Sequence, residues 1–396
     1  MRAHLTPSIL ATRDRTGGRI HLNPAVVSAS GGSAPALPTA AELNPLFGSP
    51  SGPKMAVSNN PEILWGEGVL YTNAARNPGL RAAPTELAEV MLYFHHINQR
   101  LPLGLEAPGS VLGDVFLPVN VSVLLTNPTK LPIQVDVSGA AFAQNDVDGL
   151  ALGKSPDFLV TKAWASGNLR SLALRIDPGK SALVTTLAVS GNREVDGLFK
   201  IKGSGNFNIY VVAHAKPGID EAVKQMKTDA RGDIRSPGPG KFGRTAGVYS
   251  NSTWSGRADL SIAAVGKRYS FAVNSAPNQG SPPFAGVAVL GDSAQAAVGM
   301  YGAVYDLDLC LTNESPAERK VRVSFASIGA GNPSRFWDGI GLVDGQPATI
   351  QHTPQKRSTV LKTLTLSPQS DMPFRFKAQV PGLASIPQAF SIETIA

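Results

Sequence analysis

Two adjacent histidines, His95 and His96, are the residues whose type and spacing most directly suggest chemistry. They end the apolar run of VMLYFHHINQ, residues 90–99. Imidazole side chains serve as general acids, general bases and metal ligands. If this segment is a strand, alternation places His96 on the apolar face and His95 on the opposite face. Two rings that point apart do not easily bind one metal ion. We therefore expect His96 to face the core and His95 to face solvent.

A catalytic or metal role for His95 or His96 would need a cleft and a carboxylate or hydroxyl partner. The sequence contains no His-Glu-x-x-His pattern, no Gly-x-Ser-x-Gly elbow and no phosphate-binding glycine loop. We therefore expect no metal, no cofactor and no assigned catalytic residue. A hydrolase or metal enzyme using one of these histidines stays as the less favoured alternative.

Tryptophan is the other side chain that suggests binding. Sugar-binding sandwiches present flat aromatic rings to the apolar faces of pyranoses. Trp164, Trp254 and Trp337 are far apart in the sequence. A pair of them lying coplanar on one exposed surface would indicate glycan binding, and burial would remove that function. These three tryptophans and the two histidines are the candidate binding residues.

The composition indicates a β-rich protein. The 396 residues include 40 glycines and 31 prolines, and only 16% are charged. Low charge with many turn-forming residues is typical of short strands and frequent turns. The net charge of +7 is spread along the chain rather than gathered on one element, so we expect no nucleic-acid partner. No apolar run is long enough for a transmembrane segment, and the N-terminus lacks a signal-peptide core.

The chain repeats itself. Residues 119–137 and 305–325 both alternate apolar and polar positions, stop at Leu-Thr-Asn, turn at a proline and resume alternation. A second pair of segments, 172–187 and 362–378, reads strand, proline turn, strand. Each segment reads as a β-hairpin. Two hairpins in the same order, twice, predict two tandem antiparallel β-sandwich domains, immunoglobulin-like or jelly-roll-like. One large sandwich with internal pseudo-symmetry is the alternative.

The remaining segments set the expected boundaries. Residues 1–57 are rich in proline, glycine and alanine and read as an extended arm, which could add a strand to the sheet edge of a neighbour. The first sandwich spans 58–216. A short amphipathic helix and a Pro/Gly-rich linker fill 217–246. The second sandwich spans 247–396.

Several segments resemble a known family in order and spacing. They are SNNPEILWGEGVLYT (58–72), FHHI (94–97), LLTNPTKLPIQVDV (124–137), YGAVYDLDLCLTN (301–313), FWDGIGL (336–342) and IPQAFSIETI (386–395). Together they resemble a family of uncharacterised, mostly cyanobacterial proteins, described only as a domain of unknown function and usually preceded by an export signal. The resemblance covers about residues 40–396. It implies an exported protein of the cell envelope or extracellular surface, and it assigns no catalytic residues.

These observations favour a non-enzymatic structural or interaction protein of the bacterial cell envelope or extracellular surface. We expect it to associate with a protein partner or with itself, through its sandwiches and its N-terminal arm. A carbohydrate-binding or polysaccharide-associated protein is the first alternative. The missing export signal leaves a cytoplasmic location open.

Overall fold

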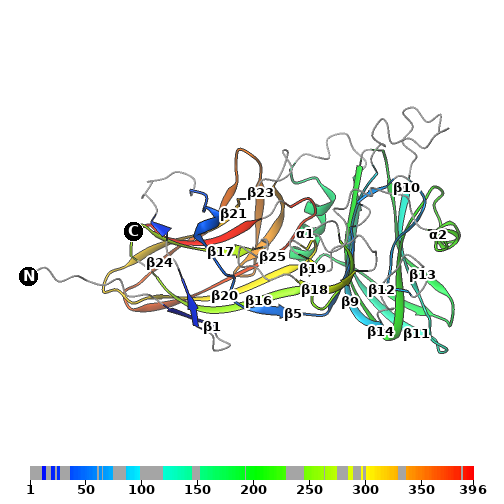
Figure 1. Cartoon of the computed structure of the whole chain (residues 1–396), viewed down its shortest axis with the longest axis horizontal. Helices are drawn as coiled ribbons and strands as arrows, with labels where there is room; N and C mark the ends of the chain where they lie inside the picture. The colour runs from blue at the N-terminus through cyan, green and yellow to red at the C-terminus, as the bar shows by residue number, and fades with distance from the viewer. Residues whose placement is uncertain are drawn as a thin grey trace, which may run out of the picture. The chain divides into compact units, whose positions relative to one another are not determined.

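The computed structural model describes residues 11–14, 19–22, 25–26, 36–59, 62–64, 66–74, 86–98, 119–144, 152–191, 193–228, 245–262, 264–273, 284–288, 296–297, 300–328, 336–384 and 387–396. Within these residues strands predominate, joined by two α-helices and one short 3-10 helix (Figure 1). The predicted all-β class is therefore confirmed. The chain forms two compact units: unit 1 is Met1–Ser51, Thr253–Pro283 and Val304–Ala396, and unit 2 is Gly52–Ser252 and Phe284–Ala303.

Unit 1 is built from two sheets. The first has the strand order β2-β1-β16-β20-β25-β22-β23, with β5 beside β16, and the second has the order β24-β21-β26-β17-β3, with β4 beside β17. Most pairs are antiparallel, but β16–β20 and β17–β4 are parallel. The bounds are β1 Ala11–Asp14, β2 Arg19–His21, β3 Ala25–Val26, η1 Ala40–Glu42, β4 Leu43–Asn44, β5 Ser49–Ser51, β16 Thr253–Ser261, β17 Lys267–Val273, β20 Val304–Asn313, β21 Arg319–Ser327, β22 Trp337–Val343, β23 Gln346–His352, β24 Ser358–Leu366, β25 Ser370–Gln379 and β26 Gln388–Thr394.

Aromatic side chains hold the two sheets of unit 1 together. Phe325 on β21 meets Trp337 on β22 with ring centroids 4.9 Å apart, and Phe376 on β25 at 5.5 Å. Phe390 on β26 stacks on Phe376 at 5.5 Å. Each contact joins a strand of one sheet to a strand of the other, so unit 1 is a sandwich with an aromatic core.

Unit 2 contains one extended sheet with the strand order β12-β11-β14-β9-β6-β15-β18-β19. Four further strands, β10, β13, β7 and β8, are hydrogen-bonded to this sheet outside that order. The 22-residue strand β14 belongs to both halves: its first part pairs with β9 and β11, and its last part with β10 and β8. The buried core lies between these halves. The bounds are β6 Lys54–Ser58, β7 Ile63–Leu64, β8 Gly68–Thr72, β9 Leu87–Asn98, β10 Val119–Thr126, β11 Ile133–Ala143, α1 Pro156–Ser166, β12 Arg170–Ile176, β13 Ser181–Val189, β14 Arg193–His214, α2 Ile219–Gln225, β15 Ala246–Tyr249, β18 Phe284–Ala288 and β19 Ala296–Ala297.

The repeated segments are β-arches, in which the two strands joined by the turn lie in facing sheets and do not pair with each other. They are not hairpins, so the hairpin prediction is wrong. Strand β10 pairs with β13 and β14, whereas its successor β11 pairs with β12 and β14. In unit 1, β20 pairs with β25 while β21 pairs with β24. Each pair of arches therefore places its outer strands in one sheet and its inner strands in the facing sheet. The alternation of apolar residues correctly indicated the strands and their buried faces, but it does not indicate which strand pairs with which.

The asparagine of the first Leu-Thr-Asn motif ties the two arches of unit 2 together. The Nδ2 of Asn127 donates to the carbonyl oxygens of Leu131 in its own turn at 2.7 Å and of Ile176 in the other arch at 2.8 Å. Its Oδ1 accepts from the backbone N–H of Thr129 at 2.8 Å. One buried amide thus closes its own turn and joins β12 to it.

Asn313, 186 residues later, makes the same contacts in unit 1. Its Nδ2 donates to the carbonyl oxygens of Ala317 at 2.9 Å, Leu366 at 3.2 Å and Ser367 at 2.9 Å. Its Oδ1 accepts from the N–H of Ser315 at 3.1 Å. We call these two residues and their bonds the Asn braces. Their equivalence means that the sequence repeat is also a repeat of the fold.

The described strands of the expected N-terminal arm belong to unit 1, except for β6, which begins at Lys54 and lies in unit 2. β1 pairs with β16, β3 and β4 pair with β17, and β5 pairs with β16. Phe47 is buried against Phe271, with ring centroids 5.1 Å apart, and its carbonyl accepts from Trp254 Nε1 at 2.9 Å. Burial of aromatic surface and ladder hydrogen bonds hold this segment to its own chain, so it is not a free extended arm.

Chain segments also divide between the units differently from the expected ranges. Residues 217–246, expected as a linker, fall within unit 2, where the described helix α2 packs on β13 and β14 (Figure 1). Residues 284–303 join unit 2 because β18 pairs with β15, which pairs with β6. Long-range pairing of this kind leaves no trace in local composition.

One of the two described α-helices, α1, was not predicted. Its signals are present in the sequence: Ser155 caps the N-terminus by accepting from the N–H of Phe158 at 3.3 Å, Pro156 is the first helical residue, and Gly167 ends the helix with φ 68°. The other helix, α2, confirms the helix predicted after residue 217, but Ile219 and Val223 of its predicted apolar face are exposed, and Ala222 is its buried residue.

Candidate functional site

The histidine pair lies on β9, and both side chains are fully buried. His96 is on the core side, as expected, and its Nε2 is 2.9 Å from Ser58 Oγ. His95 is on the outer face of the sheet, but the expectation that it faces solvent is wrong. A substrate in solution reaches neither ring in this structure.

His95 belongs to a buried polar cluster on the outer face of unit 2. Its Nδ1 is 2.8 Å from Asp196 Oδ1, and the hydroxyl of Tyr93 donates to the same oxygen at 2.7 Å. Tyr301 meets the imidazole edge-on, with ring centroids 5.9 Å apart. Burial by itself lowers the pKa of His95, but the Asp196 carboxylate overcomes this and raises the pKa to about 9. The His95 ring is therefore protonated at neutral pH, with Asp196 as its hydrogen-bond partner.

Helix α1 lies on the same face of the sheet as this cluster. It packs on β11 and β14, and Asp157 in its first turn is itself buried. The pKa of the Tyr93 phenol is raised by burial first, then by the Asp196 and Asp157 carboxylates. Asp157 in the first turn of α1 is thus near enough to Tyr93 for its charge to act on the phenol.

A third buried histidine, His352, lies in unit 1. Its Nδ1 is 2.8 Å from Ser327 Oγ and its Nε2 is 3.1 Å from Thr359 Oγ1. Burial lowers its pKa to about 3, and the nearby positive charges of Lys356 and Arg357 add to that effect. His352 is therefore a neutral hydrogen-bonding residue of the core, and its isolated position in the sequence carried no signal of this.

The three candidate tryptophans do not form a platform. Trp254 and Trp337 are buried in unit 1, with 4% and 1% of their surface exposed. Trp164 lies on α1 in unit 2 and is half-buried. Burial removes the first two from any stacking surface, so the coplanar exposed pair that would have indicated glycan binding does not form among these three residues. Trp164 is the one of the three that is not fully buried.

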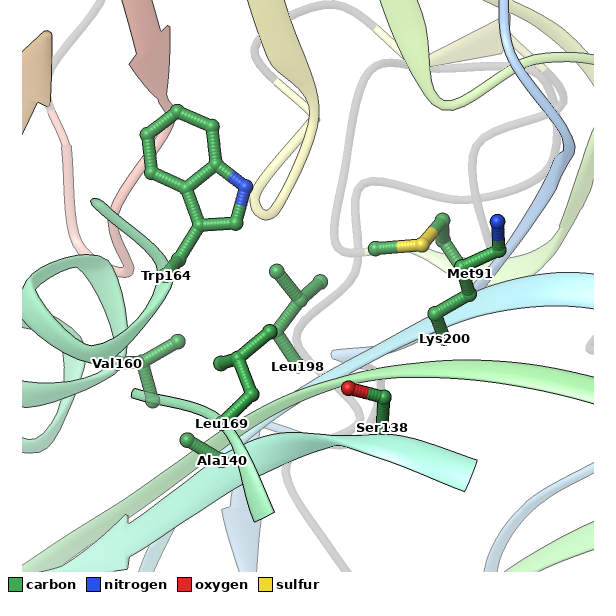
Figure 2. Close-up of a pocket in the computed structure, with 8 residues that line it drawn as sticks. All are labelled: Met91, Ser138, Ala140, Val160, Trp164, Leu169, Leu198 and Lys200. Atoms are coloured by element: carbon green, nitrogen blue, oxygen red, sulfur yellow. The ribbon is translucent and has the colours of Figure 1, made fainter. Parts of the chain in front are cut away.

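Trp164 walls a small apolar pocket on the outer face of unit 2. The pocket has a volume of about 30 Å³. Figure 2 shows the indole on one side and Met91 on the other, with Leu198 between them. The full lining is Met91, Ser138, Ala140, Val160, Trp164, Leu169, Leu198 and Lys200.

An open groove of about 540 Å³ adjoins this pocket. The two spaces share Ser138 and Lys200. The groove is further lined by Asp136, Val137, Ser171, Leu172, Ala173 and Lys202. This volume lies within the range of roughly 300–1,000 Å³ typical of small-molecule sites. We call the pocket and the groove together the outer-face groove.

The register of four strands arranges the outer face in rows. One row crosses β12, β11, β14 and β9 as Ala173, Asp136, Lys202 and Glu89; the next as Ser171, Ser138, Lys200 and Met91. A third row holds Ala140 and Leu198, under α1, and a fourth holds the buried Asp196 and His95. The first row is therefore charged and open to solvent, the third is apolar and partly covered by α1, and the fourth is polar and buried.

The sequence analysis missed the groove residues. A signal existed in the alternation of Gln134, Asp136 and Ser138 on one strand and of Lys200 and Lys202 on another, which marks the solvent side of a sheet. Alternation does not indicate which of the solvent-facing side chains line a groove. That depends on α1, an element elsewhere in the chain.

Within the described residues, no group of three or more histidine, cysteine, aspartate or glutamate side chains is placed to hold a metal ion. The helices of the described ranges are all too short or too polar to cross a membrane.

Comparison with known proteins identifies no relative by sequence: no family model matches the chain, and no curated protein matches it. Among solved structures, the chain is similar to one described as "Crystal structure of PBSX exported protein XepA", with 12% identity over 98% of this chain and 99% of that chain. The TM-score of 0.13 is too low for this likeness to carry an argument.

Proposed function

We propose that this chain is a non-enzymatic interaction protein of the bacterial cell envelope or extracellular surface, and that it binds its partner through the outer-face groove of unit 2. The observation that supports this proposal is the groove itself, an open space of about 540 Å³ over three neighbouring strands, which adjoins the small pocket lined by Trp164. The resemblance of several sequence segments to a family of exported proteins supports a location in the cell envelope or on the extracellular surface.

The distribution of titratable groups favours binding over catalysis. Catalytic acids and bases must reach the substrate, and the residues with the strongest candidacy, His95 and His96, are closed to solvent. The polar side chains that do line the open groove are hydroxyls, lysines and one carboxylate, and all of them project from strands of the sheet. Such a set supplies hydrogen bonds and orientation.

Assembly through a free N-terminal arm is not part of this proposal, since the described segments before residue 52 pair within unit 1.

The test is binding of the fluorescently labelled full chain to intact cells of the bacterium that encodes it. Ser138→Arg fills the floor of the groove, because Ser138 borders both the pocket and the groove. Thr365→Arg is the matched control, an exposed hydroxyl on β24 in unit 1. We expect the wild type and the control to bind cells and the groove variant to lose at least about tenfold in affinity. Equal binding by both variants, or no binding by the wild type, would refute the proposal.

A further inference from the structure

We propose that the outer-face groove takes a neutral oligosaccharide that contains N-acetylated hexosamine. This inference rests on the proposed function, and it adds the chemical class of the ligand. It uses Trp164, Ser138, Ser171, Asp136 and the two groove lysines, which no sequence signal assigned together.

The hydrogen-bonding groups of the groove match a ligand rich in hydroxyls. Lys200 and Lys202 donate, Asp136 accepts, and Ser138 and Ser171 do both. A sugar ring offers a donor and an acceptor at almost every carbon, so it satisfies all of these groups at once. The backbone groups of β11 and β14 are used in pairing with their neighbours, so between these two strands the floor offers side chains to a ligand, and the edge of the sheet lies at β12.

The groove is lined by two lysines and one aspartate, and Glu89, outside the lining, pairs with Lys200, so the charges at this surface cancel and favour an uncharged ligand. Lys200 Nζ lies 3.2 Å from Glu89 Oε1, and Asp136 is directly across from Lys202 on the neighbouring strand. A polyanion would have to compete with Glu89 for Lys200 and would approach the Asp136 carboxylate at a repulsive distance. A neutral polyhydroxyl chain meets neither cost.

The small pocket beside the groove selects an apolar group. Its volume of about 30 Å³ is enough for one small group, since about 10–15 Å³ of such volume already holds a water molecule. Val160, Leu198 and the indole of Trp164 line it (Figure 2). Water gains little there because polar partners are few, whereas the methyl of an acetamido group gains apolar burial. The sugar ring then packs beside the indole, with its remaining hydroxyls over the groove.

The experiment is calorimetric titration of the full chain with three hexasaccharides: chitohexaose, cellohexaose and hexagalacturonate. We expect chitohexaose to bind at least about tenfold more tightly than cellohexaose, and hexagalacturonate to bind more weakly than chitohexaose. Trp164→Ala should weaken chitohexaose binding by about tenfold or more. Thr365→Arg should leave it unchanged.

A second variant separates the pocket from general damage to α1. Ala140→Val places two methyl groups in the pocket from the strand beneath it. We expect it to reduce chitohexaose to the affinity of cellohexaose while leaving cellohexaose unchanged. The inference is overturned if wild type does not bind chitohexaose, does not prefer it to cellohexaose, or prefers hexagalacturonate, and also if Ala140→Val keeps the preference.

The cell-binding assay distinguishes this failure from a failure of the proposed function. If the groove-dependent binding to cells is competed by chitohexaose, the inference is supported. If cell binding depends on Ser138 but chitohexaose does not compete, the groove has another partner, and only the inference is refuted. If cell binding does not depend on Ser138, both are refuted.

Discussion

Removal of either Asn brace should destabilise the unit that contains it far more than a neighbouring substitution does. In unit 1 the perturbation is Asn313→Ala, with Thr312→Ala as its control. Asn313 is 1% exposed and donates to three carbonyl oxygens, one of them on the buried residue Leu366. The hydroxyl of Thr312, by contrast, makes an exposed bond to Asp371 at 2.7 Å.

The magnitude follows from what the substitution leaves behind. Each buried polar group that loses its partner costs about 1–3 kcal/mol, and water replaces the partner only at the exposed end of the turn. Asn313→Ala leaves the Leu366 carbonyl and at least one turn N–H without the amide, so we expect a loss of about 3 kcal/mol in the free energy of unfolding. An exposed hydrogen bond contributes at most about 1 kcal/mol, which bounds the effect of Thr312→Ala. Asn127→Ala should behave in unit 2 as Asn313→Ala does in unit 1.

Urea denaturation gives the change in free energy, and hydrogen exchange locates it. Asn313→Ala should release protection in β20, β21, β24 and β25, which its contacts join, while β10–β13 keep theirs. Asn127→Ala should show the reverse. The reasoning is refuted if Asn313→Ala costs no more than Thr312→Ala, or if the lost protection is spread evenly over both units.

Three further predictions concern the buried histidines and the N-terminal segment. The pKa of His352 lies near 3, below its unfolded value of about 6.5, so its contribution to stability is present above pH 6.5 and is lost as pH falls from 6.5 toward 3. His352→Asn should flatten this acid limb, which is on the order of 4 kcal/mol, in urea titrations at several pH values. The pKa of His95 near 9 has the opposite sign: its contribution, on the order of 3 kcal/mol, is complete below pH 6.5 and is lost as pH rises toward 9. Asp196→Asn should abolish this loss of stability at alkaline pH. It should also lower the free energy of unfolding by about 3–5 kcal/mol at neutral pH, because it leaves the buried His95 without its charged partner. An unchanged loss at alkaline pH would contradict the role given to Asp196. Phe47→Ala should cost about 3–5 kcal/mol and lower protection in β16 and β17, since it removes a buried ring from the core of unit 1; a surface-like cost below 1 kcal/mol would return residues 36–51 to the status of an arm.

The sequence was a good guide to strands and a poor guide to their partners. Alternation in 119–125 and 305–311 located β10 and β20 and the side of each that is buried. It gave no means of telling a hairpin from an arch, because both need a turn and two alternating strands. The information that decides between them lies in Asn127 and Asn313, whose amides bond to a second arch about 50 residues away.

His95 illustrates the same limit for the candidate site. Its position on the polar face of β9 was read correctly, and on an uncovered sheet it would be exposed. It is nevertheless buried, and Tyr301, which is distant in sequence, packs against its ring. Asp196, its partner, is 101 residues away. Local periodicity reports the face of a strand, whereas burial depends on what the rest of the chain places on it.

The two copies of the repeat differ mainly in what is inserted between their arches, and this difference bears on where function resides. Between β11 and β12 the chain inserts helix α1, which carries Trp164 onto the outer face and leaves the groove open beside it. Between β21 and β24 it inserts the hairpin of β22 and β23, which extends a sheet through β25 and buries Trp337 against Phe325. The Asn-braced frame is the same in both units, so the frame cannot account for a site in only one of them. The inserted hairpin adds two strands and widens its sheet, whereas the inserted helix packs on β11 and β14 and leaves a hollow beside it. If the outer-face groove binds a ligand, exchange of the α1 segment for the β22–β23 hairpin should abolish binding while leaving the brace contacts of unit 2 in place.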